Sequence, residues 1–262
     1  MTIADSIQIR CSELHLIMPE PTSKAEREQG SLSVGAKSHI EKIFKRNLIE
    51  SLGFESAIGF SGNKYTEKGL LIENQAISGS SFIRAQRFAK NSDRLNNGYI
   101  TGECDIYDQA NRRIIDTKCT YSIDTHPFFL ADAINKANNA GYQWQMQGYM
   151  WLYDCNIAEI DFWLLPLPEE LLKPHESREL LIDAISLIPL IKRVTTVQIK
   201  RDDVAIKRIA RKVEAANEYY QSLLQEFNDK QPFLSSSKSN TEKAENSATT
   251  PNPNSNRKQV LL

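Results

Sequence analysis

One short stretch of the sequence places charged side chains where a half-buried β-hairpin normally has apolar ones. Residues Thr101–Thr120, TGECDIYDQANRRIIDTKCT, contain two alternating runs joined by a polar turn, and this pattern predicts a hairpin. If the turn is centred on its Ala-Asn pair, Asp105 lies opposite Asp116 and Glu103 lies opposite Lys118. All four charged side chains then project from one face of the hairpin.

Two carboxylates in directly opposed positions repel each other. At about 5 Å and an effective dielectric constant near 20, the repulsion is about 3 kcal/mol. One interpretation is a solvated face, where water screens the pair and Lys118 adds a weak salt bridge. The other is a divalent cation held between Asp105 and Asp116, which turns the repulsion into coordination. Oxygen ligands of this kind favour Mg²⁺ or Mn²⁺ over zinc.

A third carboxylate, Glu73, favours the metal interpretation. It belongs to a predicted helix, KGLLIENQAI, and the positions one turn away on its own face are Gly69, Leu70, Ala76 and Ile77. A carboxylate that projects from such an apolar stripe needs a partner. Gly69 and Ala76 are small, as expected where a helix packs closely on a sheet. The alternative is a carboxylate at the edge of the helix that reaches solvent.

Gln145 and Tyr149 are one helical turn apart in QWQMQGYM, and Gly148 beside them permits close approach of another element. Taken alone, such a pair is typical of an interfacial amide beside an anchored core aromatic. It therefore indicates no function by itself.

Together these segments resemble the PD-(D/E)xK nuclease superfamily, and within it the group of lambda exonuclease and the YqaJ-like viral recombinases, which is related to the RecB-like nucleases. The motifs are KGLLIENQA around Glu73, GECD ending in Asp105, IIDTKC, and QMQGY, which matches Gln-x-x-x-Tyr. They span roughly residues 10 to 167 in the order and spacing of that group. Cys104 stands where the group often has Pro, and Asp116 where it often has Glu.

The resemblance implies an α/β fold with a restriction-endonuclease-like core, in which a central mixed β-sheet, flanked by helices, carries the active site on a β-hairpin. It also implies a metal-dependent deoxyribonuclease that uses Mg²⁺ or Mn²⁺. Lys118 is expected to orient or deprotonate the attacking water and to stabilise charge on the phosphate. Gln145 and Tyr149 would brace the site or touch the DNA backbone. The expected metal ligands are Glu73, Asp105, Asp116 and the backbone carbonyl of Thr117.

Two further segments are candidates for contacts with DNA. The opening IRCSELHLIM is similar to the group's N-terminal segment, in which a Ser contacts the DNA phosphate, so Ser12 and Arg10 are the expected DNA-binding residues. Basic residues near the last predicted helix would make binding salt-dependent, and a solvated helix face is the alternative. They are Lys200, Arg201, Lys207, Arg208, Arg211 and Lys212.

The leading functional hypothesis is a DNA exonuclease that acts on linear double-stranded ends. The resemblance implies 5′-to-3′ resection for phage-type recombination, beside a single-strand annealing protein, and relatives of this kind can form ring-shaped trimers. The competing hypotheses are an endonuclease, a RecB-like or CRISPR-associated accessory nuclease on the same fold, and a catalytically silent DNA-binding module. Linear and circular substrates would separate the first from its enzymatic rivals.

Composition limits the class of protein. The 262 residues are 40% hydrophobic and 25% charged, which suits a soluble domain with an appendage. Neither a membrane span nor a signal peptide is apparent, so we expect no membrane partner and a location in the cytoplasm of a bacterium or of a phage-infected host. The four cysteines have no CxxC spacing, which argues against a disulfide scaffold, a zinc site or an iron–sulfur cluster.

The elements that must position these residues follow from periodicity. We expect helices over residues 30–53, 63–78, 128–154 and 201–227, and a strand over residues 157–168 that Pro166 ends or confines to a sheet edge. The predicted order is helix, helix, hairpin, helix, strand, helix. Residues 1–233 form the predicted nuclease-like domain, and residues 234–262, rich in Ser, Asn, Thr and Pro, form a predicted disordered tail.

Overall fold

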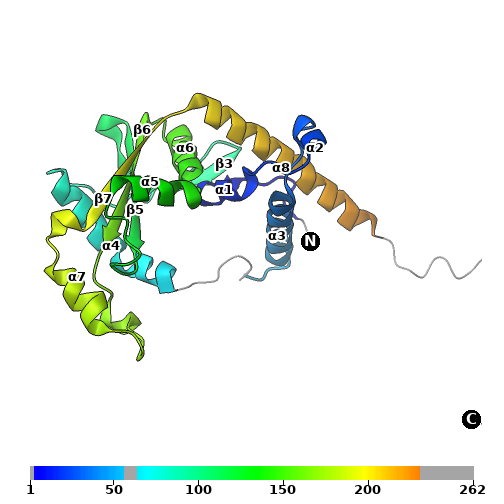
Figure 1. Cartoon of the computed structure of the whole chain (residues 1–262). Coiled ribbons are helices and arrows are strands. Elements are labelled where there is room, and N and C mark those ends of the chain that lie inside the picture. Colours follow the sequence, from blue (N-terminus) through cyan, green and yellow to red (C-terminus); the bar gives the residue numbers. More distant parts are fainter. Residues whose placement is uncertain (1–2, 56–63, 231–262) are drawn as a thin grey trace, which may run out of the picture. The chain divides into compact units, whose positions relative to one another are not determined.

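The computed structural model describes residues 3–55 and 64–230 (Figure 1). The predicted tail, residues 234–262, lies outside the described residues. The chain divides into one compact unit, Met1–Leu224, and a second that begins at Gln225. The first unit contains both β-sheets and every residue of the candidate site. No helix of the described residues is long and apolar enough to cross a membrane.

The first unit contains both helices and strands. In chain order they are β1 (Ile9–Arg10), α1 (Leu14–Ile17), α2 (Lys24–Glu28), α3 (Val34–Ser51), α4 (Lys64–Ile83), β2 (Leu95–Asn96), β3 (Ile100–Gly102), β4 (Ile106–Asp108), β5 (Arg113–Thr120), α5 (Leu130–Asn139), α6 (Tyr142–Leu152), β6 (Ile157–Leu164), α7 (Ala184–Leu187), β7 (Val194–Lys200) and α8 (Asp203–Asp229), the last of which continues past Leu224.

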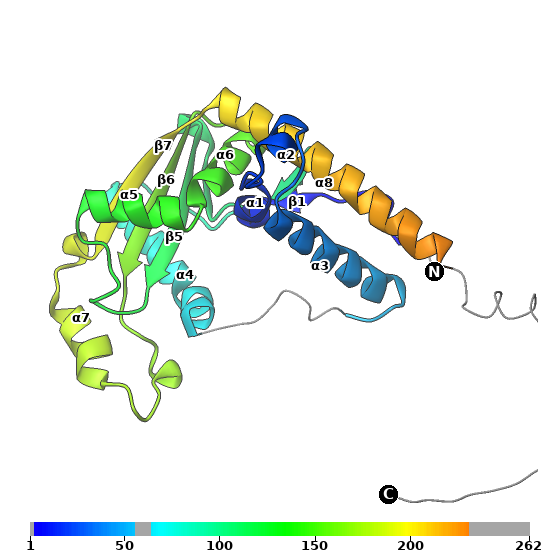
Figure 2. The same ribbon diagram turned by 45° about the vertical axis from the view of Figure 1, so that its right-hand side comes forward.

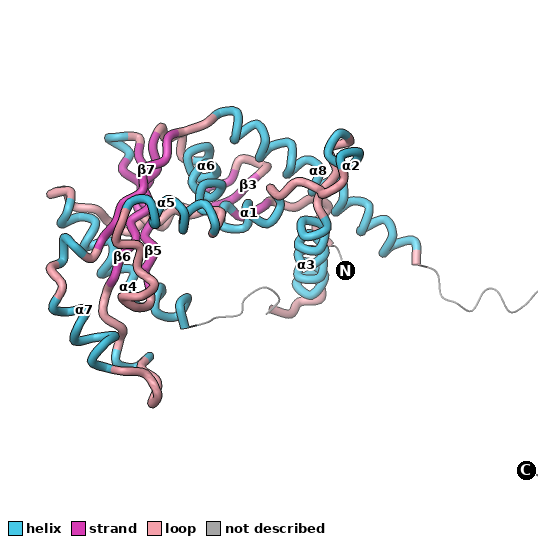
Figure 3. The backbone as a smooth tube through the Cα atoms, in the orientation of Figure 1, coloured by secondary structure: helices cyan, strands magenta, loops and turns pink. Residues whose placement is uncertain are grey.

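Four strands form the main sheet in the order β4-β5-β6-β7, and β1-β3-β2 form a smaller sheet. In the main sheet β5 and β6 are parallel, whereas β4 is antiparallel to β5 and β7 is antiparallel to β6. The long strands lie side by side in magenta in Figure 3. The predicted fold, a mixed sheet flanked by helices, is confirmed.

Helices cover both faces of the main sheet, as Figure 2 shows. Trp163 of β6 donates a hydrogen bond from Nε1 to Ser80 of α4 at 3.1 Å. The neighbouring residue Phe162 packs on Tyr142 of α6, with ring centroids 6.3 Å apart. Because successive strand residues point to opposite faces, α4 and α6 lie on opposite sides of the sheet. Every residue of β6 after Ile157 is accordingly buried.

Two polar anchors hold α4 against the sheet. Near its start, the fully buried Lys68 donates from Nζ to the carbonyl oxygens of Thr120, Tyr121 and Leu165, at 2.9, 3.1 and 2.6 Å. Burial lowers the pKa of this ammonium to about 8. The lysine thereby ties the helix to the ends of both β5 and β6.

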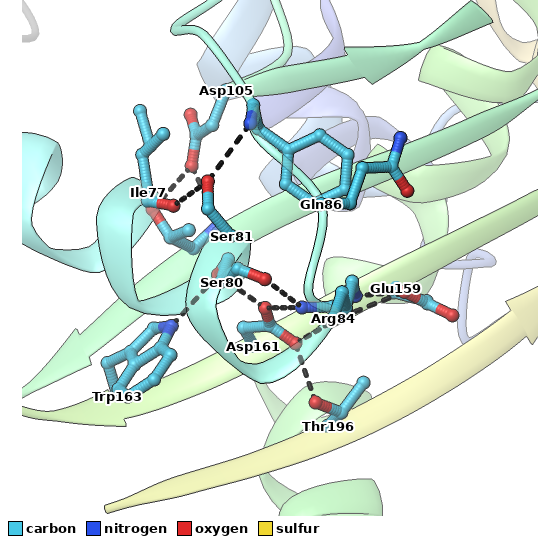
Figure 4. Close-up of polar contacts among 12 residues, drawn as sticks. Ile77, Ser80, Ser81, Arg84, Gln86, Asp105, Glu159, Asp161, Trp163 and Thr196 are labelled. Atoms are coloured by element: carbon cyan, nitrogen blue, oxygen red, sulfur yellow. Dashed lines mark hydrogen bonds and ion pairs between the residues drawn. The ribbon is translucent and has the colours of Figure 1, made fainter. Parts of the chain in front are cut away.

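The second anchor is a buried network at the end of α4 (Figure 4). The fully buried Asp161 of β6 accepts two hydrogen bonds from Arg84, each at 2.8 Å, and further bonds from Ser80 and Thr196. Arg84 also contacts Glu159 at 2.9 Å. Buried charges that are paired in this way hold two elements in a fixed relative position.

The structure agrees with most of the predicted elements and divides two of them. α3, α4 and α8 fall on the predicted helices, and β6 ends at Leu164, so Pro166 ends a strand that is central rather than at an edge. The helix expected over residues 128–154 is two helices, because Gly141 between them adopts a left-handed backbone (φ 70°) against His15. β7 and the short helices α1, α2 and α7 were not predicted.

The predicted hairpin is also divided, although its register is confirmed. Ile106 pairs with Ile115 and Tyr107 with Ile114, as a turn at residues 110–111 requires. Gly102, however, belongs to β3 in the smaller sheet. The chain therefore crosses from one sheet to the other at residues 103–105. It was wrong to place Glu103 on the same strand face as Lys118.

Candidate active site

The candidate site lies at an edge of β5. β4 pairs only with the first part of β5, as far as Ile115. Beyond that point, among the described strands, β5 has a partner on the β6 side alone. Asp116, Thr117 and Lys118 follow directly, so they lie at a free strand edge where groups from both faces of the sheet can meet.

Asp105 occupies the place where the next ladder residue would be. Its Oδ2 accepts hydrogen bonds from the backbone N–H of Thr117 at 2.6 Å and from the Thr117 hydroxyl at 2.8 Å. The carboxylate thus satisfies an edge N–H that would otherwise need a strand partner. Asp105 was predicted to lie opposite Asp116. The structure corrects this, because the Asp105 carboxylate contacts Thr117 instead.

Asp116 and Lys118 form a close ion pair. Asp116 is 1% exposed, and its Oδ2 lies 2.6 Å from Lys118 Nζ. Burial first, and then the negative charges of Asp105 and Glu73, raise the pKa of the Asp116 carboxyl to about 7. Burial opposes charge on Lys118, but the carboxylates Asp116 and Asp105 outweigh it and raise the pKa of the ammonium above its usual value. The lysine is therefore a cation at neutral pH.

Glu73 reaches the same region from α4. Its Oε2 accepts a hydrogen bond from Lys90 Nζ at 2.6 Å, and its side chain is 20% exposed. The expected close approach of Gly69 to the sheet does not occur, because space is open around it, whereas Gly79 lies against Trp163. Glu73 therefore stands at the border of the apolar face of α4. Its partner, Lys90, was not predicted from the sequence.

A pocket of about 620 Å³ brings these groups together. Its walls come from α4, from the free edge of β5, and from α5 and α6. Charged or polar lining groups include Glu73, Asp105, Thr117, Lys118 and Lys136. Lys118 Nζ also lies 5.0 Å from the ring centroid of Tyr142, which lines the pocket. Three of the predicted metal ligands and the predicted lysine thus border one cavity, and Asp116 lies buried behind Lys118.

The predicted Gln-x-x-x-Tyr pair lies on α6, one helical turn apart. Gln145 donates from Nε2 to the Tyr149 hydroxyl at 3.0 Å, and both side chains are buried. Burial and the negative charge of Asp116 raise the pKa of the Tyr149 phenol. The pair therefore lies near Asp116 on the α6 side of the sheet.

The other predicted residues lie elsewhere. Glu103 pairs with Arg94 at 3.4 Å, which removes it from the set around Lys118. Arg10 on β1 and Ser12 just after it are exposed, and neither is among the described residues that line the 620 Å³ pocket. Cys11, between them, packs closely on Gly102 and on Gly148. A Cβ at either glycine would meet the Cys11 side chain.

The basic residues near α8 divide into two groups. Arg208 and Lys212 both bind Glu20, at 2.8 and 2.9 Å, and Arg201 binds Asp203 at 2.8 Å. These three cations are therefore paired with carboxylates of the chain itself. Arg208 remains exposed despite its ion pair, and the other exposed basic side chains of the set are Lys200, Lys207 and Arg211.

The carboxylates of the site fit a divalent cation in their chemistry. Among the described residues no three His, Cys, Asp or Glu side chains stand close enough together to hold a metal as they are placed. Asp116 Oδ2 is nevertheless buried with no described partner other than the Lys118 ammonium, and Glu73 is likewise bound by an ammonium. Lys118 thus neutralises Asp116, and Lys90 neutralises Glu73. Carboxylate oxygens are the ligands that Mg²⁺ and Mn²⁺ prefer.

Comparisons with known proteins agree with this arrangement. Neither a family model nor a curated protein matches the sequence. A solved phage-related exonuclease from Haemophilus somnus 129PT is 46% identical, with a TM-score of 0.78 over 85% of this chain and 97% of that one. An alkaline exonuclease from Laribacter hongkongensis, LHK-Exo, has a TM-score of 0.54 at 13% identity over 84% of this chain and 91% of its own. The LHK-Exo complex with dAMP aligns similarly, with a TM-score of 0.52.

These likenesses place the fold among the PD-(D/E)xK nucleases, the class to which carboxylates and a lysine at a sheet edge also point. An identity of 46% across 97% of the Haemophilus protein goes further, because the chain thereby belongs to the phage-related exonuclease family. It is a nuclease. The Laribacter structures, at 13% identity, support the fold alone.

Proposed function

We propose that the protein is a Mg²⁺-dependent exonuclease that hydrolyses phosphodiester bonds at the ends of linear double-stranded DNA, with Mn²⁺ as an alternative cation. The observation that carries the proposal is the meeting of Asp105, Asp116 and Lys118 at the free edge of β5, opposite Glu73 on α4. Three carboxylates can hold a divalent cation, and the Lys118 ammonium supplies a positive charge for the phosphodiester. Metal-assisted hydrolysis of a negatively charged substrate uses both.

Each residue has a role in this proposal. Glu73, Asp105, Asp116 and the Thr117 carbonyl would hold the cation, which, when bound, polarises the phosphate and lowers the pKa of its water. Lys118 remains protonated near neutral pH because of its carboxylate neighbours. It is therefore better suited to orient the water and stabilise charge on the phosphate than to remove a proton.

The buried pair on α6 would support this arrangement. Gln145 and Tyr149 are hydrogen-bonded to each other and lie near Asp116. A buried amide and phenol held in this way restrict the position of the carboxylate beside them. We assign them a bracing role rather than contact with the DNA backbone, because both are buried.

Release of nucleotides from linear duplex DNA in Mg²⁺ tests the proposal. The wild type should digest linear duplex and leave a covalently closed circle of the same sequence intact. Asp105→Asn and Lys118→Ala should both be inactive on linear duplex. Equal digestion by the wild type and both variants would reject the site, and cutting of the closed circle would instead favour an endonuclease.

Polarity and partners form a finer part of the proposal. We propose 5′-to-3′ digestion of ends for phage-type recombination, beside a single-strand annealing protein, with a trimer as the expected oligomer. The family of phage-related exonucleases supports this context. Ser12 and Arg10, exposed beside α6, would contact the DNA phosphate. Duplexes labelled at the 5′ or the 3′ end test the polarity, because label at the 5′ end should be released first.

A further inference from the structure

Lys90 bridges the candidate site and a second groove. It lies in the segment between α4 and β2, and its Nζ is 2.6 Å from Glu73 Oε2. The Lys90 side chain is 48% exposed. The same residue borders a separate groove of about 460 Å³, which residues 86–93 and 106–110 line. The ammonium therefore contacts a proposed metal ligand while its stem belongs to a neighbouring surface.

The Lys90 ammonium contacts the Glu73 carboxylate and is influenced by the charges of two further carboxylates. The hydrogen bond that Lys90 donates to Glu73 comes first among the effects that raise the pKa of Lys90, and the charges of Glu73, Asp105 and Glu103 add to it. Glu103 is the residue that the strand pattern wrongly placed opposite Lys118. Two of the three, Glu73 and Asp105, are proposed metal ligands, so a divalent cation bound to them would compete with Lys90 for the same negative charge.

The backbone on both sides of Lys90 is fixed. On one side Phe88 donates from its N–H to Ser81 Oγ at 3.0 Å and packs on Ile77 and its neighbours; Figure 4 labels Ser81 and Ile77. On the other side Asn91 donates from its N–H to the Asp105 carbonyl at 2.8 Å. A fixed backbone with an exposed, four-carbon side chain leaves the side chain as the part that can change position.

We propose that Lys90 neutralises Glu73 in the metal-free enzyme and, when the divalent cation binds, moves to a phosphate of the DNA strand that enters along the 460 Å³ groove. This inference rests on the proposed function. An ammonium and a divalent cation at the same carboxylate repel each other, so occupation by one disfavours the other. The lining of this groove includes Arg87 and the carboxylates Asp93 and Asp108, of which Asp108 is paired with Arg113 at 2.7 Å. A lysine released at its border would add a second cation beside Arg87 for a nucleic acid backbone.

Titration of the DNA-free protein with Mn²⁺ tests the first half. Lys90→Ala should bind Mn²⁺ about two- to fivefold more tightly than the wild type, which is the range for loss of a partly exposed ion pair. Lys90→Arg should stay near the wild type, because it keeps the charge. Arg87→Ala, an exposed cation of the same segment, is the matched control and should not change the affinity.

The salt dependence of KM for linear duplex in Mg²⁺ tests the second half. Loss of one phosphate contact should lower the slope of log KM against log salt by about 0.9 in Lys90→Ala, with kcat changed less than KM. Lys90→Arg should keep the wild-type slope.

Several results would overturn the inference. Unchanged or weaker Mn²⁺ binding in Lys90→Ala would mean that Lys90 does not compete with the cation, and an unchanged slope would reject the phosphate contact. Asp105→Asn separates this inference from the proposed function. If Asp105→Asn loses Mn²⁺ binding and activity while Lys90→Ala behaves as the wild type, only the role of Lys90 is wrong. If Asp105→Asn binds Mn²⁺ as the wild type does, the metal site itself is wrong, and the inference fails with it.

Discussion

The Lys118 ammonium lies 2.6 Å from the Asp116 carboxylate, and the two residues are two positions apart on the same strand. One of these groups is buried and the other borders the pocket. The pair therefore places a fixed positive charge at the surface of the cavity and a negative charge behind it. A substrate phosphate in the pocket would meet the cation first.

Replacement of Lys118 should separate catalysis from folding. We expect Lys118→Met to lower kcat on linear duplex by about 10²- to 10³-fold, the range for loss of one group that stabilises charge in the transition state. The melting temperature should also fall, because the buried Asp116 loses its only described partner, but the methionine keeps the apolar stem beside Tyr142, and the variant should remain folded at the assay temperature. Initial rates of nucleotide release, with the melting temperature as the folding control, measure both effects. A kcat within tenfold of the wild type would contradict the role of Lys118.

Divalent cations should stabilise the native protein. At a free Mg²⁺ or Mn²⁺ concentration 100 times the dissociation constant, the free energy of unfolding should rise by about 2.7 kcal/mol. For a domain of this size the corresponding increase in melting temperature is about 5–10 °C. Asp116→Asn keeps the shape of the side chain but removes its charge, and it should abolish most of the shift. The same shift in both proteins would place the metal elsewhere.

Two glycines of α4 should respond oppositely to alanine. A Cβ on Gly79 would lie 2.7 Å from the Trp163 ring, whereas a Cβ on Gly69 would meet nothing within 4 Å. We expect Gly79→Ala to lower the free energy of unfolding by about 1–3 kcal/mol. Gly69→Ala should raise it by up to about 1 kcal/mol, because alanine favours the helix. Urea unfolding of the two variants compares them directly, and similar values would contradict the packing of α4 on β6.

Acid should destabilise the protein through His126. This residue is buried, and its Nδ1 lies 3.1 Å from the Thr120 hydroxyl. Burial, and then Lys136, lower the pKa of the imidazole to about 4. Since the unfolded chain binds this proton near pH 6.5, the free energy of unfolding falls as pH drops from 6.5 toward 4.

The variant His126→Asn isolates that contribution. Between pH 7 and pH 5 the wild type should lose about 2 kcal/mol more than the variant, by the difference between the two pKa values. Urea unfolding at both pH values measures the difference. An equal loss in both proteins would assign the acid sensitivity to other groups.

The central part of the site was predictable because it depends on local spacing. Alternation alone places Asp116 and Lys118 on one strand face, and the register of the hairpin follows from its turn. Helical spacing singled out Glu73 and the pair of Gln145 and Tyr149, and the resemblance joined them to the strand residues as one expected site. In the structure Glu73 lines the pocket, and the pair lies near Asp116. Periods of two and of 3.6 residues carry this information without knowledge of the remaining fold.

The parts that could not be predicted depend on contacts between distant residues. Glu103 leaves the hairpin because the residues before it pair with β1 and β2 instead. Lys68 is fully buried, yet a lysine in a helix is ordinarily assigned to the surface. Its partners, such as Leu165, lie far away in the sequence. β7 was missed because most of its side chains are only partly buried, which weakens its pattern.

The free edge of β5 has a consequence for the solubility of the protein. An exposed strand edge invites pairing with a strand of another molecule, and charged side chains along the edge discourage it. Asp105 occupies the Thr117 N–H, and Lys118 brings a charge to the same edge. The groups proposed for catalysis therefore also discourage β5 from pairing with a strand of another molecule. Neutralising both at once should increase aggregation during expression, even though each replacement leaves the hydrophobic core intact.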